Sequence, residues 1–288
     1  MTDGDPASAS ELVGGRYLIA AQVHAGGMSR VYQARDTETG NLVALKRPAR
    51  DDPGTLARFQ EEAAILSELN HPAIVRGLAR GGSHFADAHL VMEWLEGVTL
   101  QQQLAAGPLS LPDAVHVARR AAEALSSVHR ARIVHRDLKP ANLLLCQGSA
   151  VSTKLIDFGI ARREGARGLT VHASFAGGTW AYMSPEQAMG SAELGARVDV
   201  YSLGCVLFEA IAGRPAFPSD RAEAVVAKVW HAPPSLNDHC TDVPEPVVKL
   251  VAKMLATDPL LRPRDGTALV NDLLTLGKLP DRTASARR

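Results

Sequence analysis

The sequence lacks the features of a disulfide scaffold or a zinc module. Its 288 residues include only three cysteines, Cys146, Cys205 and Cys240. An odd number of cysteines at these spacings matches neither a set of disulfides nor a run of zinc ligands. Few, unpaired thiols are typical of a reducing compartment, so we expect three core cysteines and a cytoplasmic location.

No excess of charge and no long apolar run is present either. Thirty-one basic residues balance thirty-one acidic ones, which excludes an overall field that would attract nucleic acid or an anionic membrane. The most apolar stretch, 201–213, is too short to span a bilayer and contains Glu209. The chain begins with Asp3 and Asp5 and shows no secretory signal. We therefore expect a soluble globular protein, without a nucleic-acid partner and without a membrane segment in this chain.

The N-terminal third of the chain has the pattern of a small β-rich unit. Residues 1–12 are small and polar and predict a flexible leader. After them come short β-like runs separated by turn residues, at 16–23, 31–35, 42–46, 74–78 and 90–94. Between the third and fourth runs, apolar residues recur at three- and four-residue steps, which predicts a helix with Asp52 as its N-cap.

The rest of the chain is mostly helical in pattern. Ser110 begins a long amphipathic helix, and a second helix covers about 197–212 and ends at Gly213. The change of pattern near Glu96 and Gly97 predicts a domain boundary. We expect an α+β, bilobal fold with an antiparallel N-lobe (about 13–95) that holds one helix, a larger helical C-lobe (about 96–277) and a flexible basic tail (278–288).

Two polar motifs lie near the middle of the chain. His135-Arg136-Asp137-Leu138-Lys139-Pro140-Ala141-Asn142 follows the long helix, and Asp157-Phe158-Gly159 follows a short strand-like run. In order and spacing they resemble the motifs of the catalytic domain of eukaryotic-type protein kinases. Their residues are most similar to those of the bacterial serine/threonine branch. The resemblance extends over about residues 17–276. Any one motif alone could merely cap a turn, but the ordered set is specific.

The resemblance implies a role for each polar residue. Phosphoryl transfer requires a charged donor held in line with a hydroxyl while cations absorb its charge. By resemblance, Asp137 orients the substrate hydroxyl or accepts its proton, and Lys139 contacts the transferring phosphate. Asn142 and Asp157 would bind Mg²⁺ through hard oxygen atoms. The implied cofactors are thus ATP and Mg²⁺.

A further motif precedes these two. Val43-Ala44-Leu45-Lys46 resembles the strand whose lysine grips the α- and β-phosphates, and Glu62 on the expected helix resembles its ion-pair partner. A solvated lysine and a surface glutamate are the alternative, since both residue types are usually exposed. The position of Lys46 and Glu62 ahead of the other motifs favours the catalytic role.

The expected phosphate-covering loop departs from the family pattern. Where the family has three glycines, this chain has His24-Ala25-Gly26-Gly27-Met28-Ser29, in which only the middle glycine, Gly26, is kept. Gly26 and Gly27 could still supply the positive φ and close approach that such a hairpin needs. The family's adenine-contacting positions correspond to Val23, Val31, Ala44, Leu144 and the segment from Glu93 to Leu95.

The resemblance also implies a protein-docking segment and a regulatory one. Thr179 and Ser184-Pro185-Glu186 match the docking segment, in which Glu186 should pair with Arg262, while Asp199 should anchor the catalytic loop. Phosphorylation of Ser174 or Thr170 is expected to order the activation segment, between Asp157 and Glu186, by binding Arg136 and Arg162. Thr179 is a poorer acceptor, because its hydroxyl is expected to bridge Asp137 and Lys139.

Together these features predict a signalling enzyme. It would be a serine/threonine-protein kinase that uses ATP to phosphorylate protein substrates, including another copy of itself. Two alternatives remain. A pseudokinase-type nucleotide-binding scaffold is supported only by the eroded glycine loop. A small-molecule phosphotransferase of related fold would not need the docking segment.

Overall fold

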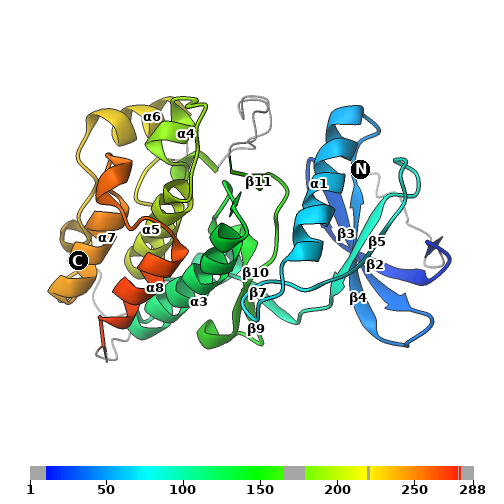
Figure 1. Ribbon diagram of the computed structural model, residues 1–288. Coiled ribbons are helices and arrows are strands. Elements are labelled where there is room, and N and C mark those ends of the chain that lie inside the picture. Colours follow the sequence, from blue (N-terminus) through cyan, green and yellow to red (C-terminus); the bar gives the residue numbers. More distant parts are fainter. Residues whose placement is uncertain (1–10, 165–178, 219–220, 278, 280–288) are drawn as a thin grey trace, which may run out of the picture. The chain divides into compact units, whose positions relative to one another are not determined.

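A computed structural model describes residues 11–164, 179–218, 221–277 and 279 (Figure 1). The chain forms two compact units. The first comprises residues up to 71 together with 75–96, and the second comprises 72–74 and the residues from 97 onward. Among the described residues, no helix has both the length and the apolar character needed to cross a membrane.

The first unit contains an antiparallel sheet of six strands in the order β1-β2-β3-β4-β6-β5. The strands are β1 (Leu12–Val13), β2 (Tyr17–Ala25), β3 (Ser29–Asp36), β4 (Leu42–Pro48), β5 (Gly77–Gly81) and β6 (His89–Glu93). Side chains alternate between the two faces of a strand. Val43 and Leu45 therefore share one face of β4, where they are buried with Tyr17, Ile19, Tyr32, Ala34 and Val91.

One strand begins later in the sequence than predicted. The run 74–78 was predicted as a strand, but β5 begins only at Gly77, and Ile74 pairs with Leu155 in the second unit instead. Ile74 is fully buried, and a short apolar run does not reveal which partner buries it.

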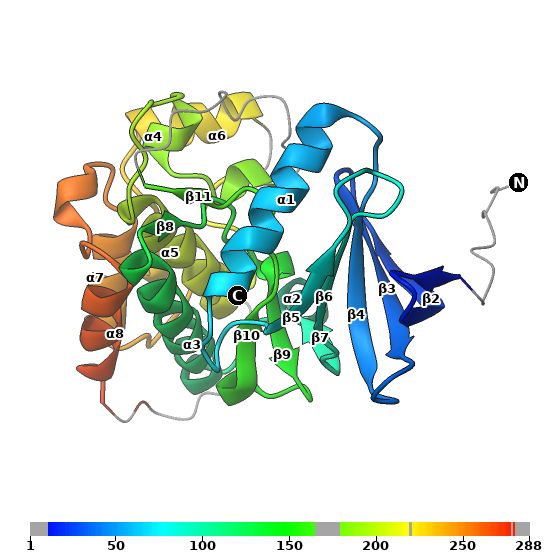
Figure 2. The same cartoon turned by 45° about the vertical axis from the view of Figure 1, so that its right-hand side comes forward.

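The helix of the first unit is α1 (Pro53–Glu68), and its start is set locally. The Asp52 carboxylate accepts a hydrogen bond from the Thr55 amide at 2.8 Å, as expected of an N-cap. Phe59, Ala63 and Leu66 are buried. A Cβ atom at Gly77 would lie 3.4 Å from Leu66, so α1 packs closely on β5 (Figure 2).

The second unit is built mainly of helices. They are α2 (Leu100–Ala106), α3 (Leu111–Arg130), α4 (Pro185–Ala188), α5 (Arg197–Ala212), α6 (Arg221–Trp230), α7 (Glu245–Met254) and α8 (Gly266–Leu274). Helix α5 is buried on nearly all sides, and α3 packs against both α5 and α8 (Figure 1). Such an arrangement requires α5 to be mostly apolar, with partners for its few polar side chains, and α3 to be amphipathic.

Short strands complete the second unit and hold its loops. Strands β7 (Gly97–Thr99), β9 (Leu143–Cys146) and β10 (Thr153–Leu155) form a sheet in the order β10-β9-β7. Strand β8 (Ile133–Val134) pairs with β11 (Arg162–Arg163). An antiparallel N-terminal sheet with one helix, followed by a mostly helical part, confirms the expected α+β class.

Helices α3 and α8 meet at Gly266 with no room for a side chain. A Cβ atom there would lie 2.3 Å from the Ser126 amide nitrogen and 2.9 Å from the Ala122 carbonyl oxygen. The same residue donates its amide hydrogen to His129 Nδ1 at 3.0 Å. His129 also contacts Asp199 in the polar site described below, so the contact with Gly266 helps to position that site as well as the two helices.

We predict that Gly266→Ala lowers the free energy of unfolding by about 3 kcal/mol, because backbone atoms of α3 cannot move aside cheaply. Helix propensity and chain entropy alone predict the opposite sign, a gain of about 0.5–1 kcal/mol. Gly27→Ala is the matched control, since nothing lies within 4 Å of a Cβ built at Gly27. Urea unfolding of the three proteins checks this, and an unchanged midpoint for Gly266→Ala would refute the steric argument.

Candidate active site

The loop between β8 and β9 gathers three of the predicted site residues. Lys139 Nζ donates to both carboxylate oxygens of Asp137, at 3.1 and 2.8 Å. Asn142 Nδ2 donates to the Asp137 carbonyl at 2.8 Å and to its Oδ2 at 3.3 Å. The structure therefore brings Asp137, Lys139 and Asn142 together as one hydrogen-bonded group.

The environment of Asp137 favours a carboxyl that can take up a proton. Burial raises the pKa of Asp137 above its ordinary value, and the charge of Asp157 acts in the same direction. The ammonium of Lys139 opposes both effects. A raised pKa brings a carboxylate closer to the range in which it works as a general base.

His135 links this loop to Asp157. Its Nδ1 lies 3.3 Å from the Asp137 amide nitrogen, which can only donate, so its Nε2 carries the hydrogen that is given to the Asp157 carbonyl at 2.6 Å. The His135 ring also meets Phe158 edge-on, with 5.1 Å between ring centroids. His135 is therefore held both by hydrogen bonds and by packing against Phe158.

Asp199, at the start of α5, holds the same loop by its backbone. Its Oδ1 accepts from the Arg136 amide and its Oδ2 from the His135 amide, both at 2.8 Å, and Oδ2 also lies 2.9 Å from His129 Nε2. Burial by itself raises the pKa of Asp199, but the bond from His129 and the nearby imidazoles outweigh it, so the pKa lies below its ordinary value. The predicted anchoring of the catalytic loop by Asp199 is therefore seen.

Two residues of this network, Gln187 and His129, were not predicted. Arg136 has a left-handed backbone, with a φ of 67°, a conformation that is strained for a residue with a side chain. Gln187 Nε2 donates to the Arg136 carbonyl at 2.9 Å, so the strained peptide is held from both sides. His129 bridges Gly266 and Asp199. No local pattern reveals either contact, because the partners lie 51 and 70 residues apart.

Asn142 and Asp157 suit the metal ion that was expected. Asn142 uses its amide nitrogen within the loop, which leaves Oδ1 as a ligand atom, and its carbonyl accepts from the Ile156 amide at 3.0 Å, next to Asp157. Over the described ranges no cluster of three or more His, Cys, Asp or Glu side chains could hold a metal by itself. Mg²⁺ takes few protein oxygens and completes its shell with water and phosphate, so this sparse donor set fits it.

In the first unit, Lys46 and Glu62 form the expected ion pair. Lys46 Nζ and Glu62 Oε1 are 2.5 Å apart, and each side chain is only 6% exposed. The register of β3 and β4 pairs Val31 with Lys46, and Ala44 lies two residues before it. Alternation therefore places Val31, Ala44 and Lys46 on one face of the sheet, opposite the buried core. The alternative of a solvated Lys46 and a surface Glu62 is excluded.

The turn between β2 and β3 is a tight hairpin rather than a glycine loop. The Gly26 amide donates to the Ser29 carbonyl at 2.9 Å, and neither Gly26 nor Gly27 has a positive φ. Their suggested use of positive φ is therefore wrong for this conformation. A Cβ atom at Gly26 would lie 3.3 Å from His24 Nε2, so the His24 ring occupies the space beside the backbone.

The remaining residues predicted to contact adenine are accessible. Val23 lies at a register irregularity of β2 and is 50% exposed. Glu93 ends β6 and accepts a hydrogen bond from the Arg76 amide at 2.9 Å, and Leu95, two residues later, is half-buried. Leu144 lies on β9 of the second unit and is also half-buried. None of these side chains is locked away in a core.

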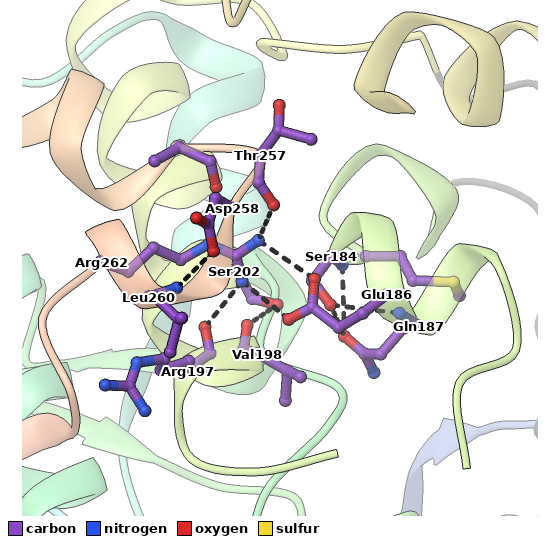
Figure 3. A network of polar contacts seen from close by, with 12 residues as sticks. Ser184, Glu186, Gln187, Arg197, Val198, Ser202, Thr257, Asp258, Leu260 and Arg262 are labelled. Carbon is purple, nitrogen blue, oxygen red and sulfur yellow. Dashed lines mark hydrogen bonds and ion pairs between the residues drawn. The ribbon is translucent and has the colours of Figure 1, made fainter. Parts of the chain in front are cut away.

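The segment predicted to dock the substrate, from Thr179 to Glu186, ends in a dense polar network (Figure 3). The predicted pair of Glu186 and Arg262 is present, with two hydrogen bonds of 2.7 and 3.0 Å. The side chain of Arg262 is fully buried and all five of its N–H donors are used, because the carbonyls of Ala256, Arg197 and Thr257 accept the others. A buried guanidinium is tolerated when its donors are satisfied in this way.

Of the predicted regulatory residues, Thr170 and Ser174 lie outside the described residues. Thr179 begins the 3-10 helix Thr179–Ala181, and its expected hydroxyl bridge concerns a side chain that is likewise outside them. Arg162 pairs in register with Val134, two residues before Arg136. The structure therefore brings the backbones of Arg162 and Arg136 into the same region.

Comparison with known proteins adds independent evidence. Residues 17–273 match the family described as "Protein kinase domain". The "probable serine/threonine-protein kinase SCO3848" of Streptomyces coelicolor is 39% identical over 256 residues, covering 86% of this chain and 38% of the relative. Serine/threonine-protein kinase PknB is 38% identical in Mycolicibacterium smegmatis, over 92% of this chain and 44% of the relative, and 39% identical in Mycobacterium tuberculosis, over 83% and 40%. The chain spans about two fifths of these relatives.

We predict that Asp199→Asn lowers the free energy of unfolding by about 3 kcal/mol at pH 7. The side-chain NH₂ group of asparagine would face N–H groups that now donate to the carboxylate, so these donors would lose their acceptor. A depressed carboxyl pKa stabilises the fold above the pKa of the unfolded chain, about 4, and this contribution disappears as the pH falls through the folded pKa. The difference from the wild type should therefore be constant above about pH 5 and shrink below pH 4.

Urea unfolding across this pH range checks both statements. Asp272→Asn, at a partly exposed pair with Lys253, is the matched control and should cost less than about 0.5 kcal/mol. Equal losses in the two variants would show that the Asp199 network contributes no special stability.

Proposed function

This chain belongs to the protein kinase family, with bacterial serine/threonine kinases among its relatives, and from that premise we propose that it transfers the γ-phosphoryl group of ATP to Ser or Thr hydroxyls of proteins. The observation that carries the proposal is the hydrogen-bonded group of Asp137, Lys139 and Asn142 in one loop. A base, a cation and a metal-binding oxygen held together are what phosphoryl transfer requires. The proposal concerns this domain and not the whole length of its longer relatives.

Asp137 acts on the acceptor. Its carboxylate orients the substrate hydroxyl and takes its proton, while the hydroxyl oxygen bonds to the γ-phosphorus and the bond from phosphorus to the bridging oxygen of ADP breaks. The raised pKa of Asp137 favours this uptake of a proton. Lys139, which is hydrogen-bonded to Asp137, supplies positive charge to the transferring phosphoryl group.

Lys46 and Glu62 act on the donor. In this proposal the ammonium of Lys46 holds the α- and β-phosphates of ATP, and Glu62 fixes the direction of the lysine side chain. Val31 and Ala44, on the same sheet face as Lys46, would contact the adenine with Val23 and Leu144. The backbone from Glu93 to Leu95 would read the edge of the base.

Asn142 and Asp157 would hold Mg²⁺ through their side-chain oxygens. When bound, the metal ion neutralises charge on the phosphate oxygens and keeps them in line with the acceptor. The protein's part is to fix these two residues, which it does through the bond from Asn142 to Asp137 and the bond from His135 to the Asp157 carbonyl.

The main alternative is a nucleotide-binding scaffold without transfer activity. Its support is the departure of the loop around Gly26 from the family pattern, with the His24 ring beside the backbone. Against it stand the Lys46–Glu62 pair and the intact loop from Asp137 to Asn142. We therefore favour catalysis.

Asp137→Asn and Asp157→Ala separate the two alternatives. We expect Asp137→Asn to keep nearly normal affinity for Mg²⁺-ATP but to lose at least about 100-fold in turnover, because only the acceptor loses its base. Asp157→Ala should weaken the binding of Mg²⁺-ATP as well. Calorimetric titration with Mg²⁺-ATP and transfer of labelled phosphate to a generic basic protein measure both quantities. A wild type that binds ATP but transfers nothing would establish the scaffold.

We also infer that the domain phosphorylates its own activation segment, at Ser174 or Thr170. A phosphate brings nearly two negative charges, enough to bind Arg136 and Arg162, whose backbones lie on neighbouring segments. Arg136 directly precedes Asp137, so ordering it would align the catalytic carboxylate. The alternative is that Arg136 pairs with a carboxylate such as Glu164.

Incubation of isotope-labelled wild-type protein with unlabelled Asp137→Asn protein as acceptor tests this second proposal, because the label distinguishes the peptides of the two chains by mass. Mass spectrometry should find phosphate on Ser174 or Thr170 of the inactive chain, which also shows that the reaction occurs between two copies. Turnover should fall at least about tenfold when both residues are alanine. Full activity of the double variant would mean that the segment needs no phosphate.

A further inference from the structure

A buried lysine on α6 contacts the backbone of the predicted docking segment. Lys228, on α6, is only 1% exposed. Its Nζ donates to the carbonyl oxygens of Ala181 and Met183, at 2.8 and 2.7 Å. Both carbonyls belong to the stretch that leads from Thr179 into α4. A single side chain thus joins two peptide groups of this stretch to a helix more than forty residues further along the chain.

The surroundings of Lys228 are unusual for a buried cation. Within the part of the chain that the structure describes, its ammonium makes no ion pair with a carboxylate. It lies instead 4.5 Å from the centre of the Phe217 ring and 5.3 Å from that of Tyr201. These rings stack on each other, with centroids 6.0 Å apart, and the Arg262 guanidinium lies 4.7 Å from Tyr201. Carbonyl oxygens and aromatic faces together replace the missing anion.

Burying an ammonium without a carboxylate is costly, so its contacts must be specific. Burial lowers the pKa of Lys228 to about 8, while the neighbouring Cys205 acts in the opposite direction. The lysine is therefore still mainly charged at neutral pH. Methionine or leucine would fill the same volume without this cost, which indicates that the two hydrogen bonds matter.

Other contacts of this stretch are made by its side chains. Tyr182, between the two gripped carbonyls, donates its hydroxyl hydrogen to Glu209 at 2.6 Å. Trp180 and Met183 pack with Ala224 of α6 in a small apolar cluster. Apolar packing limits where these side chains lie but does not orient peptide groups. The two hydrogen bonds from Lys228 act on the peptide groups themselves, at the carbonyls of Ala181 and Met183.

We propose that Lys228 is a positioning residue for the protein acceptor, which fixes the docking segment through the Ala181 and Met183 carbonyls. The proposal rests on the kinase function proposed above. A residue with this role should affect use of the acceptor and not of ATP, because its contacts lie in the docking segment. It touches no reacting atom.

Lys228→Met and Lys228→Gln test this role. Methionine keeps the length of the side chain but removes all donors, and we expect the KM for the acceptor protein to rise about tenfold with the KM for ATP within about twofold of wild type. Glutamine keeps two N–H donors without a charge and should recover part of this loss. Lys249→Met, on the exposed face of α7, is the matched control and should leave both KM values unchanged.

Hydrogen exchange measured by mass spectrometry gives a readout that does not depend on activity. Amides of residues 179–189 should exchange faster in Lys228→Met than in wild type, while those of α3 should not change. If Lys228→Met proves unfolded by thermal denaturation, Lys228→Gln carries the same comparison. A wild type without transfer activity would refute the kinase proposal, yet exchange would still report whether Lys228 holds the segment.

Two results would overturn the inference. One is an unchanged acceptor KM together with unchanged exchange in residues 179–189. The other is an equal rise in both KM values with faster exchange throughout the second unit, which would make Lys228 an ordinary core residue. A selective rise in acceptor KM, partly reversed by glutamine, supports it.

Discussion

The buried carboxylate of Asp199 is the interaction on which the polar site of the second unit depends. It accepts two backbone amides of the catalytic loop and faces His129, whose other nitrogen accepts from Gly266 on α8. One side chain therefore ties the loop to α3, α5 and α8. The left-handed backbone of Arg136 persists because the surroundings over-determine it, and Gln187 secures its carbonyl from α4.

Two aspartates in this site are tuned in opposite directions by their surroundings. Asp199 receives hydrogen bonds from amides and an imidazole, which favour its charged form and keep its pKa low. Asp137 is buried near a second carboxylate, Asp157, and its pKa is raised despite Lys139. The first is suited to a permanent anchor and the second to a group that exchanges a proton.

Two buried cations next to the docking segment are stabilised by different means. Arg262 has a planar guanidinium that engages Glu186 with two bonds and spends its other donors on carbonyls. Lys228 has a compact ammonium, and two carbonyls with two aromatic rings surround it. The rigid fork of arginine suits a bidentate carboxylate, whereas a point charge can bind converging carbonyls. Tyr201 contacts both cations, which couples the two arrangements.

Much of this protein could be predicted from the sequence alone. The order and spacing of the motifs indicated the fold class and the family, because phosphoryl transfer restricts which residue types can stand at those positions. The start of α1 was equally local, since Asp52 caps the helix from three residues away. The pairs Lys46–Glu62 and Glu186–Arg262 were anticipated only through resemblance to the family, because nothing in the sequence itself joins residues 16 and 76 positions apart.

Only the tertiary structure decided the rest. The run 74–78 was expected to be a strand, but β5 begins only at Gly77, because the backbone of Ile74 pairs with Leu155, 81 residues further along the chain. Likewise, Gln187, His129 and Lys228 looked like ordinary helical residues, and their roles depend on backbone groups that fold against them from distant segments. Sequence specifies local capping and motif chemistry, whereas buried polar groups acquire their partners only when the chain packs, because each must find a hydrogen bond wherever the fold supplies one.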